Sequence, residues 1–313
     1  QMGKAKKRGK NGLFSLIVVL LVFATVMGAF GFYQSGAYVG GNHSNTVSGE
    51  LEIHYIDIGQ GDSTLIKCGE HAMLIDAGEN DCGTQLQNYL NSQNVTKLDY
   101  IIGTHPHSDH IGGMDVIIYK FDCDVVMMPD VSNNTKTYRD VISAMKSRNY
   151  VNTVPKPGDT YKLGDAEFTI IAPSRTYDDY NNDSIGLILK YGDRKFLFTG
   201  DAEEEAEADI VKTGIDIDCD VYQVGHHGSR TSSSETLLNA ANPAYAVISC
   251  AEGNSYGHPH AQTLNEFRYR GIKVYRTDEQ GTIVCTTDGI ELKWNCSPSE
   301  SWKSGEPSKS SKQ

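Results

Sequence analysis

The residue types with the strongest chemical potential gather in one short segment, Thr-His-Pro-His-Ser-Asp-His-Ile-Gly-Gly at 104–113. Three histidines and one aspartate fall within six residues of it: His105, His107, Asp109 and His110. The His-x-His pair presents two nitrogens on one side of an extended segment, and Asp109 and His110 then face a second position nearby. Because imidazole and carboxylate groups are ligands of divalent metals, this spacing predicts a site for two ions. An incidental polar surface loop is the alternative that we consider weaker.

Two more chemically capable groups follow apolar, strand-like runs. Asp201 comes after Phe196–Thr199, and the pair His226-His227 comes after Val221–Val224. We predict that Asp201 bridges the two ions, because its two oxygens can bind one ion each. Its alternative role is the N-cap of the glutamate-rich helix expected next. For the histidine pair we predict that His226, nearest the strand end, binds metal, and that His227 assists catalysis by orienting it or by hydrogen bonding nearby.

His258 and His260 form the third histidine cluster, in Gly-His-Pro-His. We predict that they contact substrate, where a histidine can hold a phosphate oxygen or protonate a leaving group. A polar loop at a helix start is their alternative interpretation. The isolated histidines receive no functional role: His43, His54 and His71.

These groups must be positioned by strands and helices. Alternating and apolar runs predict strands at 51–58, 63–67, 72–76 and 98–103, and amphipathic spacing predicts a helix at 84–93. A strand-rich start is followed by helix–strand alternation, then by strand hairpins at 161–171 and 185–199, then by alternation again. This order suits an α/β fold of two sheets with helices on their outer faces.

The ends of the chain differ from its middle. Basic residues at 1–12 precede a charge-free, mainly apolar run at 13–33, which is long enough for one transmembrane helix. We favour an uncleaved anchor over a cleaved signal peptide. The positive flank would stay inside, which places the catalytic domain outside the cell membrane, or secretes it if the segment is cleaved. Residues 34–49 are expected to form a flexible tether, 50–296 the hydrolase domain, and 297–313 a disordered tail.

Composition limits the choice of partners. The 313 residues carry a formal net charge of −12, which argues against nonspecific coating of nucleic acid. It leaves a nuclease possible, because bound cations supply positive charge where a scissile phosphate would lie. Seven cysteines show no Cys-x-x-Cys spacing, so a cysteine zinc site is not expected, and disulfide pairing and oligomeric state stay open.

The sequence resembles a known family in six places, in order along the chain. They are His54–Ser63, Leu74–Gly78, the 104–113 segment, Phe198–Asp201, His226–Ser229 and Gly257–His260. This series is similar to the metallo-β-lactamase-like domain of ComEC-type competence (DNA-uptake) proteins, over roughly 51–294.

The resemblance implies a four-layer αββα sandwich with the metal site along one edge, and a divalent-metal hydrolase of phosphodiester bonds. His105 and His107 would hold one ion, Asp109, His110 and His226 the other, and zinc or manganese suits such ligands. No histidine lies between His110 and Asp201, where many superfamily hydrolases carry one. Asn182 or Asp183 is our candidate to complete the first ion's ligands.

We therefore expect an exported, membrane-anchored nuclease acting on single-stranded DNA in a competence-like role. An alternative is an exported metallohydrolase that acts on a cell-wall phosphoester, either phosphocholine or teichoic acid. A noncatalytic module that binds metal or DNA is a third possibility. The multi-helix channel of full competence proteins has no counterpart in this sequence, since a single anchor cannot form a pore.

Overall fold

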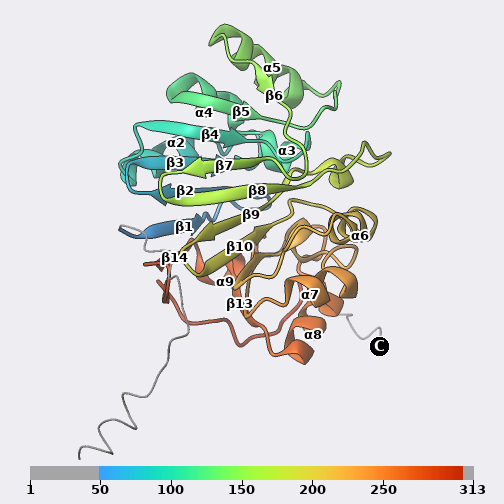
Figure 1. Ribbon diagram of the computed structural model, residues 1–313. Coiled ribbons are helices and arrows are strands. Elements are labelled where there is room, and N and C mark those ends of the chain that lie inside the picture. The colour runs from blue at the N-terminus through green and yellow to red at the C-terminus, as the bar shows by residue number, and fades with distance from the viewer. Residues whose placement is uncertain (1–48, 306–313) are drawn as a thin grey trace, which may run out of the picture. The chain divides into compact units, whose positions relative to one another are not determined.

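Residues 49–305 are described by the computed structural model, and their strands form two mixed β-sheets (Figure 1). The first sheet has the order β15-β14-β1-β2-β3-β4-β5-β6. Its strands are β1 (Leu51–Tyr55), β2 (Thr64–Cys68), β3 (His71–Ile75), β4 (Lys97–Ile102), β5 (Asp122–Met127), β6 (Asn152–Thr153), β14 (Ile283–Thr287) and β15 (Leu292–Trp294).

The second sheet has the order β13-β12-β11-β10-β9-β8-β7. In both sheets a run of four parallel strands, β3 to β6 and β10 to β13, continues an antiparallel part. The strands of the second sheet are β7 (Thr160–Leu163), β8 (Ala166–Ala172), β9 (Gly186–Tyr191), β10 (Arg194–Phe198), β11 (Val221–Gln223), β12 (Tyr245–Ile248) and β13 (Lys273–Arg276).

Helices lie on the outer faces of both sheets, toward opposite ends of the view in Figure 1. The first sheet is covered by α2 (Gly83–Ser92), α4 (Met114–Lys120) and α5 (Lys136–Ser147). The second is covered by α6 (Glu204–Lys212), α7 (Glu235–Ala241) and α8 (Ala261–Arg270). Short helical turns complete the fold: α3 (Ser108–Ile111), α9 (Thr277–Gln280), and the 3₁₀ turns η1 (Tyr180–Asp183) and η2 (Gly225–Gly228).

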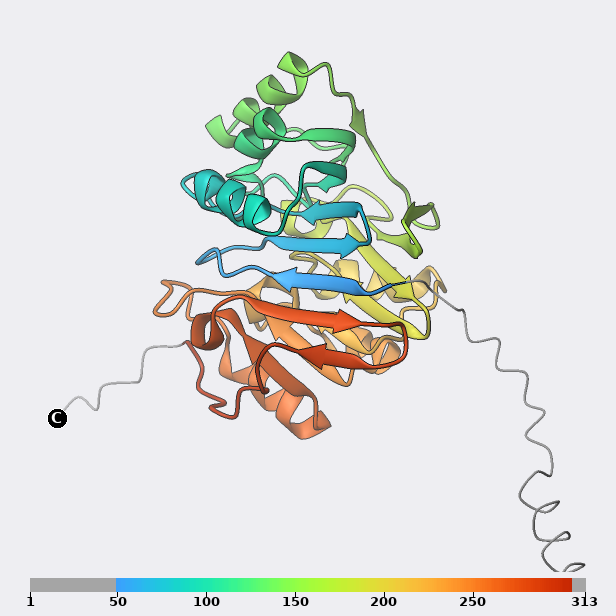
Figure 2. The same ribbon diagram turned by 90° about the vertical axis from the view of Figure 1, so that its left-hand side faces the viewer.

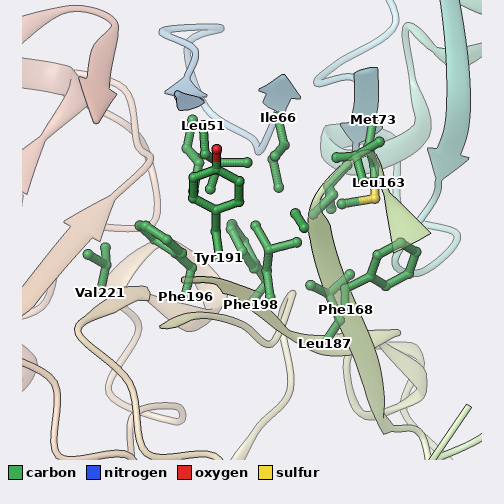
Figure 3. Close-up of a cluster of buried hydrophobic side chains, with 14 of the residues drawn as sticks. Leu51, Ile66, Met73, Leu163, Phe168, Leu187, Tyr191, Phe196, Phe198 and Val221 are labelled. Carbon is green, nitrogen blue, oxygen red and sulfur yellow. The ribbon is translucent and has the colours of Figure 1, made fainter. Parts of the chain in front are cut away.

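Strand alternation explains the layers. Successive side chains of a strand point to opposite faces, so Ile66 enters the layer between the sheets while Leu65 packs toward the helices. In the second sheet Phe196 faces the other sheet, and Leu197 packs under α6 to α8. Figure 3 shows side chains of both sheets meeting in the central layer, with Met73 opposite the strand of Leu163. Three apolar layers thus separate four structural layers, which confirms the expected two-sheet α/β sandwich.

The antiparallel strands β1 and β14 lie side by side although they are far apart in sequence (Figure 2). Their pairing places residues 283–287 beside residues 51–55, so the two ends of the domain share one sheet. All seven cysteines lie in the described part of the chain and are unpaired there, six of them buried. They act as small apolar side chains, as the apolar runs around them suggest.

The structure bears on the predicted terminal segments only within residues 49–305. Apart from Gly49, the predicted basic segment, anchor and tether lie outside the described residues, and within 49–305 no helix has the length and hydropathy to cross a bilayer. Residues 297–305, predicted as part of a disordered tail, make hydrogen bonds to the domain. There the Ser299 amide donates to the Val274 carbonyl (2.7 Å) and the Gly305 amide to the Pro259 carbonyl (2.9 Å). Backbone hydrogen bonds to the domain thus order these residues despite their polar composition.

Candidate metal centre

The chemically capable side chains meet at one edge because the parallel strands all end there. Asp76 follows β3, the 104–113 segment follows β4, Asp201 follows β10 and the His226-His227 pair follows β11. Carboxyl ends of neighbouring parallel strands share one edge of a sheet, so the two sheets present these loops to a common space. The predicted convergence of strand ends is therefore what the fold produces.

His105, His110 and Asp201 form the first possible ligand group, with ligand atoms all within 4.8 Å of one another. The His110 Nε2 atom lies 3.2 Å from Asp201 Oδ2, and His105 Nε2 lies 3.9 Å from it. His107 extends this group toward solvent, because its Nδ1 lies 3.0 Å from His105 Nε2. Asp201 is buried and is not a helix cap, since α6 begins at Glu204 with Glu203 as its N-cap.

Two further possible ligand groups share the same centre. Asp109, His110 and His227 lie within the same 4.8 Å limit, and so do Asp62, Asp201 and His227. The His227 Nε2 atom is 3.4 Å from Asp109 Oδ2 and 3.6 Å from Asp201 Oδ2. His110 is shared by the first group and the Asp109 group, and Asp201 by the first group and the Asp62 group, which suits a carboxylate that could bridge two ions.

Each buried histidine of the cluster is held through its Nδ1 atom. His110 Nδ1 donates to Asp76 Oδ2 (2.8 Å), and His227 Nδ1 lies 3.1 Å from the Ser249 carbonyl. The Thr104 hydroxyl already donates its proton to Asp76, so it accepts from His105 Nδ1 at 3.1 Å. These bonds favour the neutral tautomer protonated at Nδ1, in which Nε2 carries the lone pair that can bind a metal.

The structure separates His226 from His227. The His227 ring is 1% exposed and lies within the cluster, whereas the His226 ring is 21% exposed and its Nε2 is 3.7 Å from Asp201 Oδ2. His226 Nδ1 instead lies 3.3 Å from both Glu203 Oε1 and Thr231 Oγ1. The geometry thus favours His227 as the metal ligand and places His226 at the rim, the reverse of the roles assigned from sequence.

Backbone strain produces this arrangement. His226 and His227 both have left-handed conformations, with φ of 51° and 54°, and Gly228 follows at 82°. Such residues cost roughly 1–3 kcal/mol each and persist where the surrounding fold enforces them. The turn directs two adjacent rings toward different parts of the same centre. Strand periodicity carries no signal for this turn, so the sequence favoured His226 only by its closeness to the strand end.

The electrostatics of the cluster favour bound positive charge. Burial by itself would lower the pKa of His110, but the carboxylates of Asp201, Asp76 and Asp109 hold that pKa well above its usual value. The balance at Asp201 is the mirror image: burial opposes ionisation, yet His110 and His227 keep the pKa of its carboxyl well below the usual range. Burial lowers the pKa of His105, so this ring is neutral and its lone pair is available.

The segment without the expected third histidine is η1 and the residue after it. Asn182 Oδ1 accepts from the Glu203 amide (2.9 Å), and Asp183 Oδ1 accepts from the Tyr177 amide (2.9 Å). Neither of these two candidates lines the central cavity, whereas Asn181 does. Ser184 contributes in another way, since its hydroxyl lies 3.2 Å from His105 Nδ1 and accepts from the Asp201 amide.

A cavity of about 380 Å³ opens over the cluster. His258 lines it, and burial together with the neighbouring His227 and His226 lowers the pKa of His258 to about 3, so this ring is neutral. His260 does not line it and accepts from the Arg230 amide (3.0 Å). The lining residues are Gln60, Pro106, His107, Ser108, Asp109, Thr135, Thr137, Asn181, Asp201, His226, His227, Tyr256 and His258.

The residues present fit a metal centre. Several buried atoms around the cavity have no hydrogen-bonding partner among residues 49–305, and buried polar atoms in that condition commonly bind an ion. All are nitrogen or oxygen donors of the kinds that zinc and manganese accept. They are Asp62 Oδ1, His110 Nε2, Asn181 Oδ1, Asp201 Oδ1 and His227 Nε2.

Sequence reasoning missed two carboxylates, Asp62 and Asp76. Asp76 had a usable signal, because it ends a buried strand just as Asp201 does. Asp62 reaches the site through Gly61, which has φ +136° and passes so close to the Asp109 carbonyl that a Cβ would lie 2.3 Å from that oxygen. Only glycine permits this approach, and the Asp62 amide then donates to the same carbonyl (3.1 Å).

Comparison with solved structures supports the fold. The chain superposes on Igni18, a metallo hydrolase from the archaeon Ignicoccus hospitalis, with a TM-score of 0.53 and 16% identity over 75% of this chain and 98% of that one. CmlA, a diiron beta-hydroxylase from Streptomyces venezuelae, gives a TM-score of 0.51 and 12% identity over 74% of this chain and 53% of that one. At these identities the likeness concerns the fold alone.

Comparison of sequences identifies the family. Residues 56–252 match the model of the metallo-beta-lactamase superfamily. ComE operon protein 3 of Bacillus subtilis is 29% identical over 76% of this chain and 33% of that protein. Competence protein ComA of Neisseria gonorrhoeae is 32% identical over 75% of this chain and 32% of that protein. The chain thus spans about a third of the length of these relatives. It belongs to the metallo-beta-lactamase superfamily, with homologues that are ComEC-type competence proteins.

Proposed function

We propose that this protein is a metal-dependent phosphodiesterase that cleaves single-stranded DNA outside the cell membrane. One observation carries the proposal: buried imidazole and carboxylate atoms without partners surround Asp201 at the base of an open cavity. The similarity to competence proteins directs the choice of substrate toward DNA.

The chain's own residues divide the work. Asp201, with His105 and His110 on one side and Asp109 and His227 on the other, would hold two divalent cations. Such ions would supply a nucleophile from water at neutral pH and stabilise charge on the phosphoryl oxygens. His258 is neutral and lines the cavity, so its ring can hydrogen-bond a substrate oxygen.

The test is hydrolysis by the full chain loaded with Mn²⁺ or Zn²⁺. Single-stranded DNA and bis-p-nitrophenyl phosphate serve as substrates, and bound metal is measured by mass spectrometry. We expect Asp109→Ala and His107→Ala to lose activity on both substrates. His71→Ala is the matched control, because His71 is half exposed at the start of β3, the end opposite Asp76, and pairs with Asp99. Undiminished cleavage by Asp109→Ala and His107→Ala would refute the assignment.

A small phosphodiester is the second candidate, and one observation favours it. No lysine or arginine is among the cavity-lining residues of the described chain, so no basic track accompanies a long polyanion there. A phosphocholine ester of the cell wall carries one phosphate and a cationic choline, so it needs no basic track. Teichoic acid, the other cell-wall candidate, is a polyanion like DNA and is not favoured by this observation. Parallel assays on these esters and on DNA rank the two substrates by kcat/KM.

We also propose that residues 13–33 hold the enzyme in the membrane, since their apolar length suits a bilayer. The expected result is that the full chain stays with membranes after an alkaline wash, whereas a chain beginning at residue 34 is released. External protease should reach the catalytic domain in intact cells that have lost their wall. A washed-off full chain, or a protected domain, would contradict this topology.

A further inference from the structure

The mouth of the cavity carries one aromatic side chain whose exposure calls for an explanation. Tyr256 lines the cavity and is 63% exposed. Its ring is stacked on His258, with centroids 5.6 Å apart and planes at 19°. Its hydroxyl makes no hydrogen bond to any residue between 49 and 305. This tyrosine therefore contributes little to the core and presents its ring to the solvent at the active site.

The loop around Tyr256 is held in shape by Asn254. The Asn254 amide group donates to the carbonyls of Ala251 (2.9 Å) and His258 (2.6 Å), and its Oδ1 accepts from the His258 amide (3.0 Å). Behind it, the Gly305 amide donates to the Pro259 carbonyl (2.9 Å). The ring is thus presented from a braced loop, which lowers the entropy lost when a ligand stacks on it.

The charge of the site makes such a surface necessary. The cavity lacks lysine and arginine, so the bound cations alone would attract a phosphate, and they would do so for any phosphodiester. Aromatic stacking is the usual way to grip a nucleic acid strand without charge, because every base has a flat apolar face. Tyr256 is the one large exposed apolar side chain of the described residues that also lines the cavity.

We propose that Tyr256 is a stacking platform for the nucleobase next to the scissile phosphate. The inference rests on the proposed phosphodiesterase function and refines its substrate class to an unpaired nucleotide. A base within a duplex has both faces covered by its neighbours, so only a single strand or a strand end offers a face to Tyr256. Selectivity for single strands thereby follows from an uncharged contact.

The experiment compares two substrates with the same backbone. One is a single strand of thymidine nucleotides, and the other is a strand of equal length built from tetrahydrofuran abasic units. With the metal-loaded full chain, kcat/KM should be about ten-fold higher for the thymidine strand, the size of one base–aromatic stack. Tyr256→Ala should remove this preference by raising KM at nearly constant kcat. Tyr256→Phe and Tyr256→Trp should keep it.

Tyr269→Ala is the matched control, because Tyr269 is 87% exposed on α8 and does not line the cavity. It should behave as the unmodified protein does. Equal cleavage of both strands by the unmodified protein, or a preference that survives Tyr256→Ala, overturns the stacking role while leaving phosphodiester hydrolysis intact. Failure to cleave either strand with any divalent metal overturns the proposed function and the stacking role together. Unchanged melting temperatures confirm that the variants fold.

Discussion

His110 is held closely from both sides, because a carboxylate lies within 3.2 Å of each of its ring nitrogens. Asp76 holds Nδ1 at 2.8 Å, and Asp201 lies 3.2 Å from Nε2. Asp76 is itself fixed by the Thr104 amide and hydroxyl, both at 2.8 Å. The ring orientation therefore depends on a carboxylate that does not need to touch a metal.

Asp76→Asn should lower metal affinity or activity about 10- to 100-fold, the usual effect of losing a carboxylate behind a ligating histidine. The amide can still contact Thr104 but no longer stabilises the proton on His110 Nδ1. Calorimetric titration of the metal-free protein with the metal measures the change in affinity.

Asp99→Asn is the control for this substitution. Asp99 bonds His71 Nδ1 at 2.8 Å, so it forms the same kind of pair on the protein surface. It should leave metal affinity unchanged. Equal affinities for Asp76→Asn and the unmodified protein would remove Asp76 from the support of the centre.

A second prediction at this scale distinguishes the adjacent histidines. His227→Ala should lower the bound metal from two ions to one and abolish hydrolysis, because the buried ring reaches both Asp109 and Asp201. His226→Ala should retain both ions, since its ring lies at the rim beside Glu203. Elemental analysis after dialysis gives the stoichiometry. Loss of an ion only in His226→Ala would restore the role predicted from the sequence.

At the scale of elements, α6 carries a buried carboxylate with no part in the metal centre. Glu207 is fully buried, and its oxygens accept from the amides of Ser233 (2.6 Å) and Ser234 (2.8 Å) at the start of α7. Burial raises the pKa of Glu207 from 4.5 to about 7, although these hydrogen bonds oppose the change. The carboxyl therefore links α6 to the start of α7, and its charge in the folded protein depends on pH near neutrality.

The sign of the resulting pH dependence follows from that raised pKa. The folded state binds the proton more tightly, so this contribution to stability is fully present below pH 4.5 and is lost as the pH rises to 7. Its size is at most about 3 kcal/mol. We expect Glu207→Gln to reduce the change in the urea midpoint of the metal-free protein between these two pH values. Glu205→Gln, an exposed residue of the same helix, should not; equal slopes in both variants would contradict the prediction.

The sequence predicted long strands and helices better than the short elements whose conformations depend on long-range contacts. Runs such as Leu65-Ile66 and Phe196-Leu197 alternate between two apolar layers, so periodicity located their strands within a residue or two. The two-residue strand β6 and the turns α3 and η2 were missed, because they are too short to show a period. Their conformations depend on contacts with residues that are distant in sequence.

The candidate site shows the same division. His105, Asp109, His110 and Asp201 could be recognised because they follow apolar strands. Asp62 could not, because it reaches the centre through a glycine whose backbone touches the Asp109 loop. Asn181 was passed over in favour of its two neighbours, since a 3₁₀ turn decides which of three consecutive polar residues faces the cavity.

At the scale of the whole molecule, the net negative charge opposes the proposed binding of DNA. The chain carries a formal net charge of −12, and acidic residues lie on two sides of the site: Asp57, Glu79 and Asp81 near Gln60, and Glu203 to Glu205, beside Arg230, near Asn182. For the proposed DNA substrate, these carboxylates would repel the strand. Binding would then rely on cations held in the centre and on uncharged contacts.

This balance predicts a weak salt dependence for DNA cleavage. A single strand that is neutralised at one or two phosphates gives a slope of about −1 in log kcat/KM against log salt, or roughly four-fold between 50 and 200 mM. The measurement holds free metal constant, and bis-p-nitrophenyl phosphate reports any effect of salt on the metal centre itself. Its slope should be close to zero because it carries one charge.

A slope steeper than about −3 would require four or more phosphate contacts with basic side chains, which the cavity does not offer. Repeating the series with a chain that begins at residue 13 then locates the source, because the residues before it hold Lys4, Lys6, Lys7, Arg8 and Lys10. A steep slope that persists in that chain would contradict the binding of DNA through cations and stacking. A shallow slope in both chains supports a nuclease that holds its substrate by the reacting phosphate and one neighbouring base.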